Sequence, residues 1–288
     1  MEIIVGKNAG FCYGVKKAVE GAEEELQNDD RIYCLGEIVH NKDVVNDLEN
    51  KGIRFIDNIK EAEGTTLIRA HGIPKSVYKD AESKKIILKD YTCPKVLNIH
   101  NIAEEYANKG YFIILTGSKT HPENIGTISY CGLNYYVIET EDEIKYALEA
   151  IEKSEINKIL LISQTTFSVE KFEKITNQIK ELLSEEKELI IKNTICSATK
   201  VRQIETEEIS KKVSKMIIIG GKNSSNTKKL FEIAKKNCKD SFCIENVKDL
   251  DVKIFNSDDI VGIMAGASTP LKSINEVIEK LKNAILSS

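Results

Sequence analysis

The sequence predicts an α/β fold of three similar units, each with a small and mostly parallel sheet, in a pseudo-threefold arrangement around a central cavity. Two observations predict this fold. A β-branched run that ends at a cysteine occurs three times, and an amphipathic helical pattern and a strand ending in glycine follow each cysteine. The spacing from cysteine to glycine is always 24 residues, for Cys12 to Gly36, Cys93 to Gly117 and Cys196 to Gly220. Strands that alternate with helices imply parallel pairing, and ligands bind at the carboxyl ends of such strands.

The first unit is predicted over residues 1–90. It begins with the strand IIV ahead of Cys12, and a helical pattern follows the cysteine. The strand RIYCLG comes next, and His40 lies four residues beyond its glycine. A helix, the short strand IRFID and the strand TTLIRAHG then follow, and His71 lies at the C-terminal end of the last of these. This unit therefore offers three polar loops at strand ends, around Cys12, His40 and His71.

The second unit, 91–193, and the third, 194–288, repeat the same order. Their glycine-ending strands are YFIILTG and KMIIIGG, their short strands are YYVIE and FCIE, and their later strands are KILLISQTT and IVGIMAGAST. The polar loops again follow strand ends. They carry Cys93, His121, Thr165 and Thr166 in the second unit and Cys196, Ser224 and Ser268 in the third.

Composition excludes several classes of protein. The 288 residues are 41% hydrophobic and 30% charged, without an apolar run of the roughly 20 residues that a membrane span needs. The net charge is -4 and the lysines are scattered, which argues against a nucleic-acid partner. The chain begins directly with a strand and without a signal-peptide pattern. We therefore expect a soluble cytoplasmic protein that contacts neither membrane nor nucleic acid.

The cysteines indicate a metal cluster. Seven occur, an odd number, and none forms the CxxC pairs of structural zinc sites. Cys12, Cys93 and Cys196 each stand at a strand-to-helix turn, where the helix dipole favours negative charge. Thiolates are the ligands of iron–sulfur clusters, and three of them leave one iron of a cubane open. The alternative is that these three are buried apolar residues, as we expect for the other four cysteines.

The remaining polar loops indicate a small anion and a proton donor. The run NSSNT offers Ser224, Ser225 and Asn226 beside the unpaired N–H groups of a helix start, although ordinary helix capping would also explain it. Glu123, two residues after His121, is a candidate proton donor. His100 falls on the apolar side of a predicted helix, so we expect it in the core.

Nine motifs together resemble one family. They contain the three cysteines (GFCYGV, YTCP, NTICSAT), the histidines at 40, 71 and 121 (VHN, AHG, THPE), and the polar runs QTT, NSSNT and AGASTP. They are similar to those of the 4-hydroxy-3-methylbut-2-enyl diphosphate reductase (LytB) family, and the resemblance runs from about residue 3 to residue 275. Members of that family catalyse the last step of the methylerythritol phosphate route to isoprenoid precursors.

The resemblance implies one [4Fe-4S] cluster on Cys12, Cys93 and Cys196, with the substrate hydroxyl at the open iron. Two electrons and two protons then remove this hydroxyl as water and give isopentenyl and dimethylallyl diphosphate. It implies catalytic roles for Glu123, Thr165 and His121, and a ferredoxin or flavodoxin as electron donor. The resemblance also implies that the substrate contacts His40, His71, His121, Thr165, Ser224, Ser225, Asn226 and Ser268.

Three other functions stay open at this point. A three-cysteine dehydratase similar to quinolinate synthase would need groups for carboxylate and imine chemistry, whereas NSSNT and THPE favour a diphosphate. An iron–sulfur sensor or electron carrier would need a protein ligand for every iron, and no fourth cysteine keeps the repeat spacing. A structural zinc protein would be colourless, so a visible spectrum distinguishes it.

Overall fold

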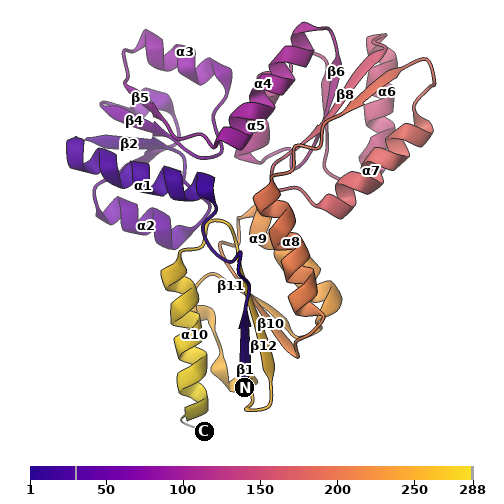
Figure 1. Ribbon diagram of the computed structural model, residues 1–288. Coiled ribbons are helices and arrows are strands. Elements are labelled where there is room, and N and C mark those ends of the chain that lie inside the picture. The colour runs from indigo at the N-terminus through magenta and orange to yellow at the C-terminus, as the bar shows by residue number, and fades with distance from the viewer. Residues whose placement is uncertain (30, 287–288) are drawn as a thin grey trace. The chain divides into compact units, whose positions relative to one another are not determined.

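The computed structural model describes residues 1–29 and 31–286, and this part of the chain contains three four-stranded sheets (Figure 1). Every described strand pair is parallel. By compactness the chain divides into two units. The first comprises Met1–Lys16, Val39–Asp47 and Ser197–Ser288, and the second comprises Lys17–Ile38 and Leu48–Cys196.

The second unit contains two of these sheets, and the first of them has the order β3-β2-β4-β5. Its strands are β2 (Ile32–Leu35), β3 (Arg54–Ile56), β4 (Thr65–Ile68) and β5 (Leu88–Asp90). Tyr33, Leu35 and Ile68 pack against Val77 and Ala81 of α3 (Lys75–Ser83). Two further helices belong to this part of the sequence, namely α1 (Tyr13–Asn28) and α2 (Lys42–Asn50).

The other sheet of the second unit has the order β7-β6-β8-β9 and is covered on both faces. Its strands are β6 (Phe112–Thr116), β7 (Tyr135–Ile138), β8 (Lys158–Ser163) and β9 (Glu188–Ile191). Side chains of α6 (Ile144–Ser154) and α7 (Val169–Leu182) pack against one face. Residues of α4 (Pro94–Asn108) and α5 (Pro122–Ile128) pack against the other. Burial on both faces explains why β6 and β8 are continuous runs of Ile and Leu.

The sheet of the first unit has the order β1-β12-β10-β11. Its strands are β1 (Glu2–Val5), β10 (Lys215–Ile219), β11 (Ser241–Ile244) and β12 (Ile260–Ala265). Apolar residues of α8 (Ser197–Ser210) and α9 (Ser225–Asn237) pack on one face. Those of α10 (Leu271–Leu286) pack on the other. The parallel α/β class predicted from the sequence is therefore confirmed.

One strand departs from the predicted ranges. The described strands of each sheet fall within 1–90, 91–193 and 194–288, except that β1 pairs with β12 instead of joining the sheet of β2. The reason lies in the repeat, since the strand leading to the next cysteine forms the edge beside β4 and beside β8. Between β12 and residue 286 the structure describes a helix and no strand, and the N-terminal strand β1 takes the equivalent edge beside β12. The division into three units with these boundaries, and their threefold arrangement, stay predictions.

Within 1–29 and 31–286, no helix has both the length and the apolar character needed to cross a bilayer.

Candidate functional site

Cys12, Cys93 and Cys196 occupy one equivalent position in the three repeats. Each directly precedes a helix, α1, α4 or α8, and each is partly exposed. Each backbone N–H also donates at 3.0 Å to a carbonyl in the loop after a central strand. The accepting carbonyls belong to Ala267 for Cys12, Ala70 for Cys93 and Thr165 for Cys196. The predicted equivalence of the three cysteines therefore extends to their hydrogen bonds.

The loop that carries Cys12 is held by α8 of the same unit. Arg202 donates to the Gly10 carbonyl at 2.7 Å, and its guanidinium is buried. One turn later, the Glu205 carboxylate accepts the N–H groups of Lys7 and Asn8 at 2.6 and 3.0 Å. These bonds fix the backbone before the cysteine, so the thiol has a defined position within the first unit.

Three of the other four cysteines are buried, as predicted, whereas Cys243 is only partly buried. Cys34, Cys131 and Cys238 are buried, and their thiols donate to backbone carbonyls of Gly36, Thr127 and Ser214, respectively. Burial raises the pKa of Cys34 and of Cys131 to about 12. A thiol that stays protonated at neutral pH is a poor metal ligand. Cys243, on the edge strand β11, is partly buried, and burial also raises the pKa of its thiol.

The first unit brings together Ser224, Asn226, Ser268 and His40. Ser224 caps α9, because its Oγ accepts the N–H of Thr227 at 3.3 Å. The Ser268 hydroxyl donates to the His40 carbonyl at 3.0 Å, which joins the third loop of this unit to the segment Val39–Asp47. Ser225 begins α9 and is partly exposed. The capping alternative for NSSNT is thus correct for Ser224, but it leaves Asn226 unexplained.

Asn226 carries the clearest sign of a polar ligand in the first unit. Its side chain is 3% exposed, and neither its Oδ1 nor its Nδ2 has a hydrogen-bond partner among the described residues. Leaving a buried amide unsatisfied costs about 1 to 3 kcal/mol. Sites that bind polar ligands are a common place for such a group, because the ligand supplies the missing bonds.

The second unit brings Glu123 and Thr165 into direct contact. Glu123 lies in the first turn of α5 and is 1% exposed. One carboxylate oxygen accepts the backbone N–H of Thr165, and the other accepts its hydroxyl, both at 2.6 Å. Burial raises the pKa of Glu123 to about 7, and the two bonds from Thr165 limit that rise. This carboxyl therefore keeps its proton to a higher pH than an exposed glutamate does.

His121 lies two residues before Glu123, and His71 contacts the ring of His121. His121 caps α5, and its Nδ1 accepts the N–H of Glu123 at 3.2 Å. An Nδ1 that accepts a hydrogen bond leaves the ring proton on Nε2, so His121 presents a donor there. The rings of His71 and His121 meet edge to face with centroids 5.4 Å apart.

His100 is a core residue, as the sequence predicts. It is 2% exposed and stacks on Tyr130 with ring centroids 4.4 Å apart. Burial lowers the pKa of His100 to about 4, so it stays neutral under ordinary conditions.

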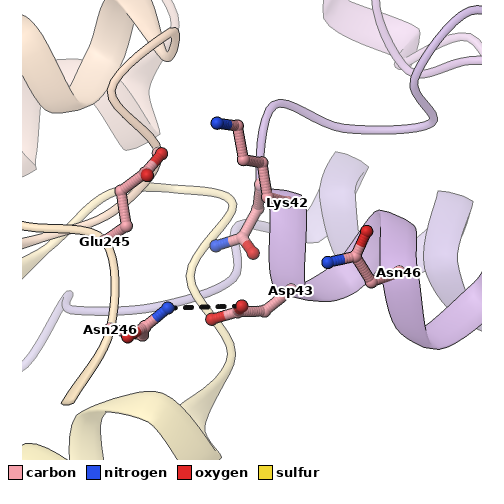
Figure 2. A pocket seen from close by; sticks show the side chains of 7 residues that line it. Lys42, Asp43, Asn46, Glu245 and Asn246 are labelled. Carbon is pink, nitrogen blue, oxygen red and sulfur yellow. Dashed lines mark hydrogen bonds between the residues drawn. The ribbon is translucent and has the colours of Figure 1, made fainter. Parts of the chain in front are cut away.

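A polar cavity of about 140 Å³ in the first unit is a different feature (Figure 2). Lys42, Asp43, Asn46, Glu245 and Asn246 are among the residues that line it, and Asn246 donates to Asp43 at 3.4 Å. Two carboxylates face one lysine here, so the lining disfavours an anion such as a diphosphate. Neutral donors, as found at Ser224, Asn226 and Ser268, suit that ligand better.

Sequence reasoning missed two residues that support Glu123. Gln164 and Asn124 are both buried, and they connect the loop before α5 with α5 itself. The motif QTT contains Gln164, but the sequence indicates a role only for its two threonines. A signal was available, because Gln164 stands at the same place after β8 as Arg69 does after β4.

Cys12 lies in the first unit, whereas Cys93 and Cys196 lie in the second. The convergence of the three thiols on one cluster therefore stays a prediction. The first unit holds the neutral polar groups of Ser224, Asn226 and Ser268, and the second holds the buried carboxyl of Glu123. Together, fold and site define a parallel α/β protein with three repeated cysteine loops.

Comparison with known proteins identifies the family. The pattern of the LytB protein family matches residues 3–282, so the chain belongs to that family. It is similar to 4-hydroxy-3-methylbut-2-enyl diphosphate reductase of Caldanaerobacter subterraneus subsp. tengcongensis, with 46% identity over 98% of this chain and 97% of that protein. The enzyme of the same name from Clostridium perfringens (strain 13 / Type A) is 44% identical over 97% of this chain and 98% of the relative.

Solved structures agree with this assignment. One, described as (E)-4-hydroxy-3-methyl-but-2-enyl diphosphate reductase, the terminal enzyme of the non-mevalonate pathway, has a TM-score of 0.70 and 37% identity, covering 98% of this chain and 100% of its own. Another, the E-1-hydroxy-2-methyl-but-2-enyl-4-diphosphate reductase of Plasmodium falciparum, has a TM-score of 0.89 and 30% identity, covering 98% and 88%. The family predicted from the motifs is confirmed.

Proposed function

We propose that this protein reduces 4-hydroxy-3-methylbut-2-enyl diphosphate, removing its hydroxyl with two electrons and two protons to release water. Isopentenyl and dimethylallyl diphosphate are the expected products. The relatives that share the whole length of the chain bear the name of this reductase. Within the structure, the observation that carries the proposal is a buried carboxyl at Glu123, bonded to the residue whose carbonyl anchors Cys196.

The reduction needs an electron source, and the family is iron–sulfur dependent. We assign Cys12, Cys93 and Cys196 as ligands of one [4Fe-4S] cluster, because these three thiols are partly exposed at helix starts while Cys34, Cys131 and Cys238 are buried. When bound, such a cluster would pass electrons to the substrate and offer an open iron to its hydroxyl. Three equivalent thiols and the negative charge favoured at helix N-termini fit this group.

Glu123 is the proposed proton donor. A proton donor works best when its pKa lies near the working pH, and burial brings the pKa of Glu123 to about 7. Thr165 holds both carboxylate oxygens through its N–H and its hydroxyl, so the carboxyl has one orientation. After Glu123 gives up its proton, the same two bonds stabilise the carboxylate.

The diphosphate would be held by neutral donors. His121 presents Nε2–H, and His71 packs against its ring. Ser224, Ser225, Asn226 and Ser268 supply hydroxyl and amide groups in the first unit, near the segment that carries His40. The unsatisfied amide of Asn226 supports this assignment most directly, since phosphate oxygens would accept from its Nδ2.

The electron donor is expected to be a small carrier of the ferredoxin or flavodoxin type, and the enzyme is expected in the cytoplasm.

The decisive experiment combines spectroscopy with turnover. We would purify the protein anaerobically and record visible and Mössbauer spectra with and without 4-hydroxy-3-methylbut-2-enyl diphosphate. A cubane cluster with one iron site that changes on adding substrate, together with formation of both products, supports the proposal. A colourless protein after anaerobic reconstitution, or a coloured one that does not consume this diphosphate, contradicts it.

A further inference from the structure

In each sheet, a polar group lies against the glycine that ends one central strand. Gly36, Gly117 and Gly220 have φ values of +71°, +151° and +156°, which side chains other than glycine rarely adopt. A Cβ at any of them would also come within 2.2 to 2.4 Å of a polar atom. The atoms belong to Arg69 at Gly36, Asn124 at Gly117 and Thr227 at Gly220, and Gln164 is a further 2.6 Å neighbour at Gly117.

Gln164 makes the most complete set of bonds among these groups. Its Oε1 accepts the backbone N–H of Ser118 at 3.0 Å and the Nδ2 of Asn124 at 3.1 Å. Its Nε2 donates to the hydroxyl of Thr166 at 2.8 Å. Asn124 closes the network by donating to the Ser118 carbonyl at 2.8 Å. Gln164 and Asn124 are 1% and 0% exposed.

These bonds join three segments that carry the proposed catalytic residues. Ser118 lies in the loop that ends at His121, and Asn124 follows Glu123 in α5. Thr166 follows Thr165 in the loop after β8. A bare glycine at 117 is what allows Gln164 to approach Ser118 so closely, since a Cβ there would collide with its amide.

We propose that Gln164 is a positioning residue that sets the alignment of Glu123 with Thr165 and of His121 beside them. It acts through Ser118, Asn124 and Thr166, and not through contact with the carboxyl itself. The inference deepens the proposed function and rests on it, because Glu123 matters only if the protein transfers a proton.

The equivalent residues of the other sheets explain why glutamine is needed here. An amide accepts two N–H groups on its oxygen and donates from its nitrogen, which is what the three partners require. Arg69 has only donors and could not accept from a loop N–H. After β12 the equivalent residue is Gly266, and the hydroxyl of Thr227 occupies the space of its missing Cβ. Only the second of these sheets bears the proposed proton donor, and only there does the residue join all three loops.

The test compares Gln164→Met, which keeps the length of the side chain and removes its polar atoms, with Ile159→Val, which trims a buried core residue of β8, the strand before Gln164. Cluster-loaded proteins would be assayed for kcat across pH and for hydrogen exchange of peptides covering residues 117–128 and 164–168. We expect Gln164→Met to lower kcat by about 10-fold to 100-fold. The fall of kcat at high pH, called the pH limb below, should move to higher pH, because Thr165 no longer holds the Glu123 carboxylate in place. Hydrogen exchange should be faster in both peptides. Ile159→Val should match the native enzyme in pH limb and local exchange.

Thr166→Val removes one partner of Gln164 and is the milder variant if Gln164→Met does not fold. It should shift the pH limb in the same direction with a smaller loss of kcat. The inference is overturned if the folded variant has the same kcat, the same pH limb and the same hydrogen exchange as the native enzyme. A fall in kcat with unchanged pH limb and exchange also overturns it, since Gln164 would then act on the substrate directly. If the native protein does not reduce the diphosphate, the proposed function fails. Hydrogen exchange of residues 117–128 and 164–168 in Gln164→Met then still shows whether Gln164 holds these loops in position.

Discussion

Replacing Thr165 with valine should raise the pKa of Glu123 and move the pH dependence of catalysis upward. Valine keeps the shape of threonine but removes the hydroxyl that donates to the Glu123 carboxylate at 2.6 Å. The backbone N–H of residue 165 still donates to the other oxygen. A hydrogen bond to a charged group contributes about 1.5 to 3 kcal/mol. At about 1.4 kcal/mol for each pKa unit, its loss raises the pKa from about 7 by about 1 to 2.

The direction in which the pH dependence of kcat moves follows from the role of the Glu123 carboxyl. A proton donor is active when protonated, so kcat falls as pH rises through its pKa, and a higher pKa moves that fall to higher pH. The assay is kcat for the diphosphate from pH 6 to about pH 9, with a chemical reductant so that no protein partner limits the rate. Infrared difference spectra of the protonated carboxyl would follow the same titration without turnover.

Thr176→Val is the matched control. Thr176 is a buried threonine of α7 in the same unit, and its hydroxyl has no partner among the described residues. Its replacement should leave the pH limb unchanged. A limb in Thr165→Val that stays in place or moves to lower pH would refute the reasoning, because Glu123 would then not be the group that titrates.

Three further predictions concern the other parts of the site. Glu123→Gln should keep substrate binding and lower kcat by about 100-fold or more, measured by calorimetry and steady-state assay; full turnover would exclude Glu123 as proton donor. Cys93→Ser should lose cluster iron by metal analysis, while the same change at the buried Cys131 should keep it; equal iron in both would reject the ligand assignment. Asn226→Leu should stabilise the substrate-free protein by about 1 kcal/mol in urea unfolding and weaken diphosphate binding, and tighter binding would contradict its role.

Much of the fold follows from the repeat in the sequence. The 24-residue spacing and the β-branched runs predicted the strand–helix–strand order, and each predicted cysteine loop lies at a helix start. The pairing of β1 with β12 was not predictable from local pattern, because an edge strand is chosen by which sheet lacks one. Only the topology of the whole chain determines that choice.

Candidate site residues could be predicted from the sequence where they are of a chemically distinctive type. They could not be predicted where their role depends on which residues surround them in the fold. Cysteine, histidine and a glutamate after proline are visible in the sequence. Gln164 looks like any polar residue after a strand, and its role depends on β6 lying beside β8, so that Gly117 faces it. The burial of Glu123 has the same origin, since a loop glutamate is ordinarily exposed.

Thr165 is bonded both to the proposed proton donor and to the backbone of a proposed cluster ligand. Its N–H and hydroxyl bind Glu123, and its carbonyl accepts the N–H of Cys196. Ala70 and Ala267 accept the other two cysteine N–H groups in the same way but have no hydroxyl to offer. Each repeat thus supplies one carbonyl that accepts the N–H of a cysteine. In the second repeat this residue is a threonine where the other two have alanine, and its hydroxyl also binds the Glu123 carboxylate. Since burial alone raises the pKa of Glu123, the bonds from Thr165 keep it near neutrality and fix its distance from the Cys196 loop. A larger effect of Thr165→Val than of Thr165→Ser on the pH limb would separate this hydroxyl contribution from simple packing.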